Sequence, residues 1–188
     1  MAEKRDIEPS DVQAIIDVFD EDKNLAPRCR KVGELLKDRL YDISSHYWDY
    51  WTSMGKFPEM QDPENVEKAR AKTAVFIGKR LGDIENAEWS TFLTRQIMDS
   101  CQRGIPLKNV NAASIRTNAF TLKLLGEVYG VEQEDYQDLA TAILTATGLE
   151  LSIMAMCHTA YHANQNATRR QEQTSQFESE DRKSTRLN

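Results

Sequence analysis

Hydrophobic positions recur along the chain at the spacing of α-helices, and no segment alternates for long enough to predict a β-strand. A short amphipathic segment, SDVQAIIDVF, predicts a helix close to the N-terminus. Apolar side chains then recur every three or four positions through residues 28–54, which predicts one long helix that ends near Gly55 and Pro58. The apolar stripe of this long helix consists of Val32, Leu36, Leu40, Ile43, Tyr47 and Trp51.

Two shorter helices are predicted in the middle of the chain. Asp62 followed by Pro63 is typical of a helix start, because an aspartate caps free backbone amides and proline has no amide hydrogen to leave unpaired. We expect this helix to end at Gly82. The next helix is expected over residues 87–103, with Gly104 as its left-handed C-terminal cap.

The last two predicted helices, which begin near residues 111 and 133, are apolar on more than one side. The sequence therefore predicts an all-α fold in which these helices are covered on two faces. Either they form a four-helix bundle with the same pair of a second subunit, or they lie at the centre of one subunit. Beyond Tyr161 the pattern turns wholly polar and predicts a solvated helix.

Composition narrows the class of protein. The chain has 188 residues, 40% hydrophobic and 29% charged, with a formal net charge of -6, which is typical of one globular domain. No run of basic and aromatic residues predicts a nucleic-acid surface, and no uninterrupted apolar run reaches the roughly 20 residues that span a bilayer. Three cysteines without a CxxC pair predict reduced thiols. We therefore expect a cytoplasmic protein without nucleic-acid or membrane partners.

The C-terminal residues divide into two parts. Residues 162–180 are expected to be a polar helical linker. Residues 181–188, DRKSTRLN, match the translation of a widely used sequencing adaptor, so we expect them not to be native. On this interpretation residues 1–161 are the domain, and the natural chain continues beyond residue 180 into an output module.

The order of these motifs resembles a known family. HYWDYW ends the long helix, FPEMQDPENVEKARAKTAVFI and RQIMDSCQRGIP follow, and LELSIMAMCHTAY lies in the last helix. This order is similar to the globin-coupled sensors, the sensor globins at the front of bacterial signal transducers. The resemblance covers about Ile7 to Tyr161. It implies a globin-like fold with an extra N-terminal helix and a long C-terminal helix, haem and oxygen binding, homodimerisation and a chemotaxis-type or nucleotide-cyclising output module.

Cys101 stands where the resemblance places the haem-ligating histidine. DSCQRGIPLK keeps Arg103 and Pro106 of the family's pattern, but its turn is one residue shorter, and the aromatic pair that usually opens the next helix is absent. The repeat of Ile97 and Cys101 predicts an inward-facing sulfur. It can be a small hydrophobe of the core, a thiolate ligand of haem iron, or a reactive thiol. Haem is therefore expected only if the thiolate takes the place of imidazole.

The resemblance implies a ligand pocket beside Cys101. It places the opposite wall of this pocket on the long helix and on the helix that follows it. Its expected residues, which together with Cys101 and Ile97 form the candidate cofactor site, are Tyr47, Trp48, Trp51, Thr73, Phe76 and Ile77. An aromatic cluster at helical spacing is also typical of ordinary core. Tyr47 alone among them offers a phenolic hydroxyl to a bound gas molecule.

The sequence gives little support to metal binding or enzymatic catalysis. His158 and His162 lie four residues apart, so their rings can share a helical face and chelate a divalent metal, but the sequence offers no third ligand. No paired carboxylates, nucleophile elbow or glycine-rich phosphate loop is present. We therefore expect a sensory protein rather than an enzyme; the alternatives are a haem-free signalling module and a thiolate-haem enzyme.

Overall fold

The structure is a computed structural model that describes residues 7–21, 23–55, 61–85 and 87–186, and the side chains of these residues except 87–88 and 178–186. The described residues form helices and connecting turns, with no strand among them. The chain is therefore all-α, as predicted. The helices are α1 (Pro9–Phe19), α2 (Leu25–Leu36), the 3-10 turn η1 (Lys37–Arg39), α3 (Leu40–Ser53), α4 (Pro63–Gly82), α5 (Ala87–Gln102), α6 (Leu107–Tyr129) and α7 (Tyr136–Arg186).

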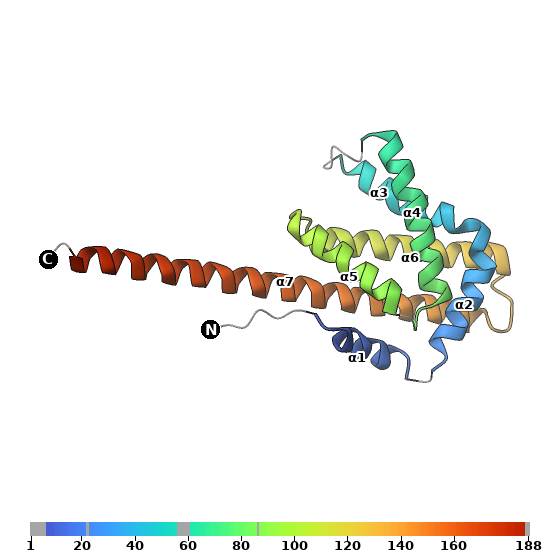
Figure 1. Ribbon diagram of the computed structural model, residues 1–188. Helices are drawn as coiled ribbons and strands as arrows, with labels where there is room; N and C mark the ends of the chain where they lie inside the picture. Colours follow the sequence, from blue (N-terminus) through green and yellow to red (C-terminus); the bar gives the residue numbers. More distant parts are fainter. Residues whose placement is uncertain (1–6, 22, 56–60, 86, 187–188) are drawn as a thin grey trace.

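Helix α7 organises the whole molecule (Figure 1). Its first half packs against α1, α2, α5 and α6, and its second half projects away from the body as a single helix (Figure 1). Consecutive helices α6 and α7 run antiparallel, joined by the short turn that begins at Gly130 (Figure 1). Helices α3 and α4 pack on each other, and α3 also packs on α6. One helix therefore links the inside of the body to the far end of the chain.

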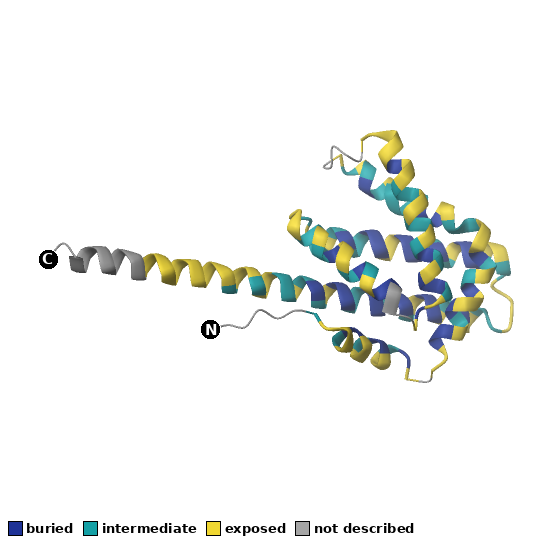
Figure 2. Cartoon of the chain, viewed as in Figure 1, coloured by how far each residue is buried: buried dark blue, intermediate teal, exposed yellow. Residues whose placement is uncertain are grey.

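Burial follows this arrangement. The inner half of α7 and much of α6 are buried, whereas the described part of α7 beyond Tyr161 is largely exposed (Figure 2). Leu149, Ile153 and Cys157 of α7 have no exposed surface and belong to the larger of two apolar clusters. The prediction that the helix becomes solvated after Tyr161 is confirmed.

The predicted start of α4 is confirmed. The Asp62 side chain accepts a hydrogen bond from the backbone amide of Glu64 at 3.0 Å, and Pro63 occupies the first helical position. Gly104 closes the turn after α5 with a φ of 70°, a left-handed conformation that glycine adopts without a Cβ clash. Both helix boundaries could be predicted from local rules. Asp62 has a hydrogen-bonding reason to precede α4, and Gly104 has a steric reason to follow α5.

The predicted long helix over residues 28–54 is wrong in one respect. It is broken into α2 and α3 by the 3-10 turn Lys37–Arg39, after which the chain changes direction (Figure 1). The break lets α2 pack on α7 while α3 packs on α6. A 3-10 turn of three residues shifts the apolar stripe too little to interrupt its spacing, so periodicity cannot detect it. The helix ends at Ser53, and Pro58 lies outside the described residues.

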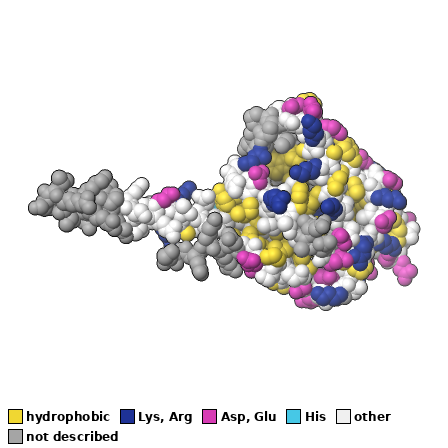
Figure 3. All heavy atoms as spheres, viewed as in Figure 1, with side chains coloured by type: hydrophobic (Ala, Val, Ile, Leu, Met, Phe, Trp, Pro, Cys, Tyr) yellow, Lys and Arg dark blue, Asp and Glu magenta, His cyan; other side chains and the backbone are white. Residues whose placement is uncertain are grey.

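The outer faces of α6 and α7 are only partly covered. Ile115 of α6 and Leu144 of α7 remain 51% and 58% exposed in the single chain. On the face in view, hydrophobic side chains lie in patches between charged ones (Figure 3). Within Tyr136–Phe177, one stretch of α7 is also long and apolar enough to cross a membrane, with a mean hydropathy of 1.6, but half of it is buried in the body. A buried core helix has the same properties, so this is weak support for a membrane span.

Candidate functional site

A cavity of about 190 Å³ lies among α3, α4, α5, α6 and α7. Each of these helices contributes side chains to its wall, and α7 contributes Glu150 and Met154. The structure brings the predicted site residues together here, with the exception of Cys101. The predicted residues that line the cavity are Tyr47, Trp48, Trp51, Thr73, Phe76, Ile77 and Ile97.

The α3 side of the cavity is aromatic. The ring of Tyr47 makes edge contacts with Trp48 and Trp51 at centroid distances of 5.4 and 6.1 Å. The indole Nε1 of Trp48 donates a hydrogen bond to Thr73 Oγ1 at 2.9 Å, which ties α3 to α4. Burial raises the pKa of Tyr47 to about 12, so its phenol stays protonated at neutral pH. This wall therefore presents neutral aromatic surface.

A buried ion pair also lines the cavity. Arg80 of α4 and Glu150 of α7 are joined at 2.7 Å between Nη1 and Oε2, and each side chain is only 5% exposed. Arg80 Nη2 also donates to Asn118 Oδ1 of α6 at 3.1 Å, and Asn118 Nδ2 donates to the Ser114 carbonyl at 2.9 Å. All four residues line the cavity. The network therefore connects α4, α6 and α7 through the cavity wall.

Cys101 does not line the cavity, which corrects the expectation that its sulfur stands on the pocket wall. Ile97 and Ser100 of α5 do line it. Successive helical residues are 100° apart, so Cys101 lies at the edge of that face, where it packs against the apolar cluster that contains Cys157 of α7. Cys101 is half-buried, and this burial raises the pKa of its thiol. The protonated thiol is therefore favoured at neutral pH, as expected of a packing residue.

The histidines lie elsewhere. His46 stacks on Phe120 at a centroid distance of 4.4 Å, away from the cavity lining. His158 and His162 bring their Nε2 atoms to 3.1 Å on the outer part of α7, a spacing at which two imidazoles can hold one metal ion. Within the described part of the chain, however, no group of three metal-ligating side chains occurs. The pair is therefore an incomplete site.

The residues around the cavity do not fit a haem iron. Haem proteins supply histidine, thiolate, phenolate or a methionine paired with histidine as axial ligands. Among the residues that the structure describes, no histidine or cysteine lines the cavity, and the raised pKa of Tyr47 opposes phenolate formation. Met154 lines the cavity without a histidine to pair with. The cavity is also smaller than the roughly 300–1,000 Å³ of usual cofactor pockets. Its size and lining fit a small organic molecule instead.

The sequence interpretation did not identify the polar side of the site. A signal was present, because Glu150 interrupts the apolar run LATAILTATGLELSIMAM, and Arg80 lies on the same helical face as Phe76 and Ile77. Charged side chains on an apolar stripe are almost never buried unless they are paired. Arg80 and Glu150 could therefore each have been predicted to be buried and paired. The sequence does not show that they are partners of each other.

Comparison with protein-family models, with curated proteins and with solved structures gives no match. The structure itself identifies an all-α protein with a small cavity and a buried ion pair in the cavity wall.

Proposed function

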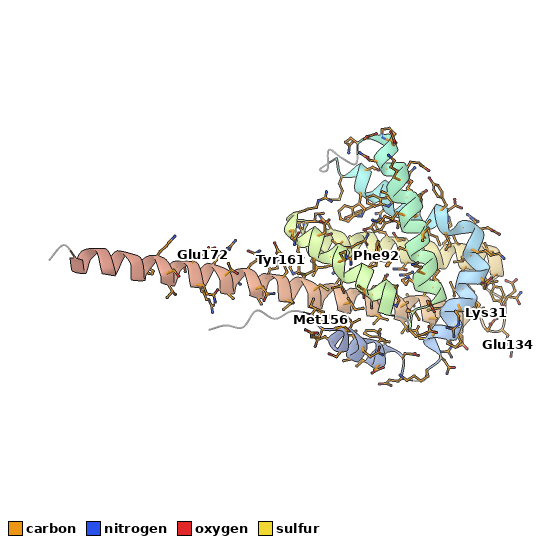
Figure 4. The ribbon with its side chains drawn as sticks, viewed as in Figure 1. Lys31, Phe92, Glu134, Met156, Tyr161 and Glu172 are labelled. Carbon is orange, nitrogen blue, oxygen red and sulfur yellow. The ribbon has the colours of Figure 1, made fainter. Side chains whose placement is uncertain are left out.

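We propose that this chain is the sensory domain of a signal transducer, with a globin-like arrangement of its helices and a small ligand in place of haem. The main support is that Glu150 and Met154 of the cavity wall belong to α7, one unbroken helix of 51 residues that runs from Tyr136 to Arg186. Met156, Tyr161 and Glu172 mark successive points along this route out of the body (Figure 4). A ligand that changes the packing of the side chains around the cavity can therefore act directly on α7, the helix that leaves the body.

The proposed mechanism is a population shift. A ligand that fits one packing of α5, α6 and α7 better than another favours that packing, and small displacements of α7 then reach an attached chemotaxis-type or nucleotide-cyclising output module.

We also propose a homodimer through α6 and α7, supported by the exposed Ile115 and Leu144 on these two helices. The free cysteines Cys29, Cys101 and Cys157 agree with a cytoplasmic location.

The cavity should control the position of α7, and this can be tested without knowing the ligand. Ser114 lines the cavity, so Ser114→Leu fills it as a permanent occupant would. We expect the distance between spin labels at Val75 on α4 and Gln171 on α7, both exposed, to change by about 1–2 Å or more, as in other helix-shift transitions. The measurement is pulsed electron spin resonance in a Cys101→Ser background.

The matched control is Ala119→Leu, which adds side-chain bulk to the exposed face of the same helix. It should leave the label distance unchanged. Identical distance distributions in the parent protein, Ser114→Leu and Ala119→Leu, with all three folded by circular dichroism, would contradict a link between the cavity and α7.

Haem should not bind stably. Protein purified after expression with added haem is expected to lack a Soret band. Among the described residues no histidine or cysteine lines the cavity, and burial keeps the Tyr47 phenol protonated. Absorption spectroscopy of the purified protein measures this directly. A stoichiometric Soret band that disappears in Cys101→Ala would instead establish thiolate ligation and would overturn the haem-free proposal.

A further inference from the structure

Two polar atoms of the cavity-lining residues have no hydrogen-bond partner among the described residues. They are Arg80 Nε and Thr117 Oγ1. Arg80 is 4% exposed and Thr117 is 8% exposed, so bulk water does not satisfy them. A buried donor without a partner destabilises the folded state, because it has lost its hydrogen bonds to water. Both atoms can donate to an oxygen acceptor, and a ligand that carries one would recover this energy.

The charge of the cavity wall favours an uncharged ligand. Glu150 neutralises Arg80 at 2.7 Å, and Asp99 lies 3.8 Å from Arg103 among the more exposed lining residues. An anionic ligand would lie near the like charge of Glu150, and a cationic ligand would lie near the like charge of Arg80. In both cases the opposite charge is already paired within the protein. Because burying an unpaired charge is strongly unfavourable, both signs are disfavoured.

Size and shape restrict the ligand further. A cavity of about 150 Å³ in another protein holds benzene, and this one measures about 190 Å³. Tyr47, Trp48 and Phe76 give it flat aromatic surface on the α3 and α4 sides. A single ring with a small substituent fits this space.

We propose that the cavity binds an uncharged molecule about the size of a monosubstituted benzene, whose oxygen accepts hydrogen bonds from Arg80 Nε and Thr117 Oγ1. The inference deepens the proposed sensory function and rests on it, because it names the chemical class of ligand that the sensor takes. The aromatic wall holds the ring, and the two unpaired donors fix its orientation.

Four probe molecules with equal numbers of heavy atoms and similar shape separate the effect of the acceptor oxygen from the effect of charge. Acetophenone carries the acceptor, α-methylstyrene replaces its oxygen by carbon, benzoate is anionic and benzamidinium is cationic. We expect acetophenone to bind at least about tenfold more tightly than any of the others, as measured by NMR titration of the Ile97 and Met154 methyl groups, which line the cavity.

Thr117→Val tests the hydrogen bond itself, since it replaces a hydroxyl with a methyl group of similar size. It should weaken acetophenone binding between about twofold and tenfold and leave α-methylstyrene binding unchanged. Thr141→Val, at an exposed position on α7, is the control and should change neither affinity.

The outcomes separate this inference from the proposed function. Absence of binding by all four probes, equal binding of acetophenone and α-methylstyrene, or tighter binding of either ion would overturn the ligand class, even if Ser114→Leu moves α7. Acetophenone binding in the expected order without any change in the label distance would support the ligand class and contradict the sensory function.

Discussion

Substitution of Arg80 by methionine is expected to lower the free energy of unfolding by about 3–5 kcal/mol. The change leaves the Glu150 carboxylate buried without its counter-charge and removes the donor to Asn118 Oδ1. Taking one partner out of a buried ion pair is far more costly than never burying the pair. Urea denaturation of Arg80→Met and the parent protein measures the difference, with the denaturant slope compared to check that both unfold in one cooperative step.

The double variant Arg80→Met, Glu150→Leu identifies the cause. With both charges removed, most of the lost stability should return, because an apolar pair of similar volume is often as stable as a buried salt bridge. Lys123→Met is the control for loss of an exposed pair with Glu127, and it should stay within about 0.5 kcal/mol of the parent protein. An equally large loss in the single and double variants would show that the arginine stem, not its charge, stabilises the core.

In the proposed mechanism the response starts at the buried ion pair in the cavity wall. It connects α4 to α7 through one contact of 2.7 Å, and Asn118 extends it to α6. A ligand bound to Arg80 Nε shares this side chain with Glu150 and Asn118, which use its other two nitrogens, so ligand binding and the packing of α7 are linked physically. This is why the proposed signal runs through α7 rather than through the exposed surface.

Helix order and most helix boundaries could be predicted from the sequence, because they depend on local rules. Asp62 and Pro63 cap and start α4, and Gly104 ends the turn after α5. The turn at Lys37–Arg39 could not be predicted, because the apolar stripe continues across it. What bends the chain there is the packing of α2 on α7 and of α3 on α6, which is tertiary.

The candidate site was predictable to a similar extent. Helical spacing groups Tyr47, Trp48 and Trp51 correctly on α3, and they meet Thr73 and Phe76 of α4 at the cavity. The same spacing cannot separate neighbouring edges of one helical face. It therefore does not distinguish Ile97, which lines the cavity, from Cys101, which packs beside it against the apolar cluster that contains Cys157. A rotation of about 40° on the helix decides this difference, and only the packing of α5 on α7 determines it.

Replacement of Trp89 by alanine should lower the free energy of unfolding by about 3–5 kcal/mol, the usual loss for a fully buried large aromatic side chain. Trp89 is 1% exposed near the start of α5, and its indole N–H donates to the Ile84 carbonyl in the turn after α4. It therefore fixes the position of the helix that carries Ile97 and Ser100 to the cavity. Urea denaturation measures the total loss, and amide hydrogen exchange should show the largest relative acceleration in α5.

Trp89→Phe helps to separate packing from hydrogen bonding, because it retains an aromatic ring in the core but removes the indole N–H together with part of the ring. Its loss should be smaller, about 1–3 kcal/mol, since the Ile84 carbonyl is left unpaired. Val75→Ala, at a position that is 62% exposed on α4, is the control for loss of apolar surface and should fall within about 0.5 kcal/mol of the parent protein. A loss below about 1 kcal/mol for Trp89→Ala would mean that α5 is not anchored by this ring, and the cavity would then lose the rigid wall that orients its ligand.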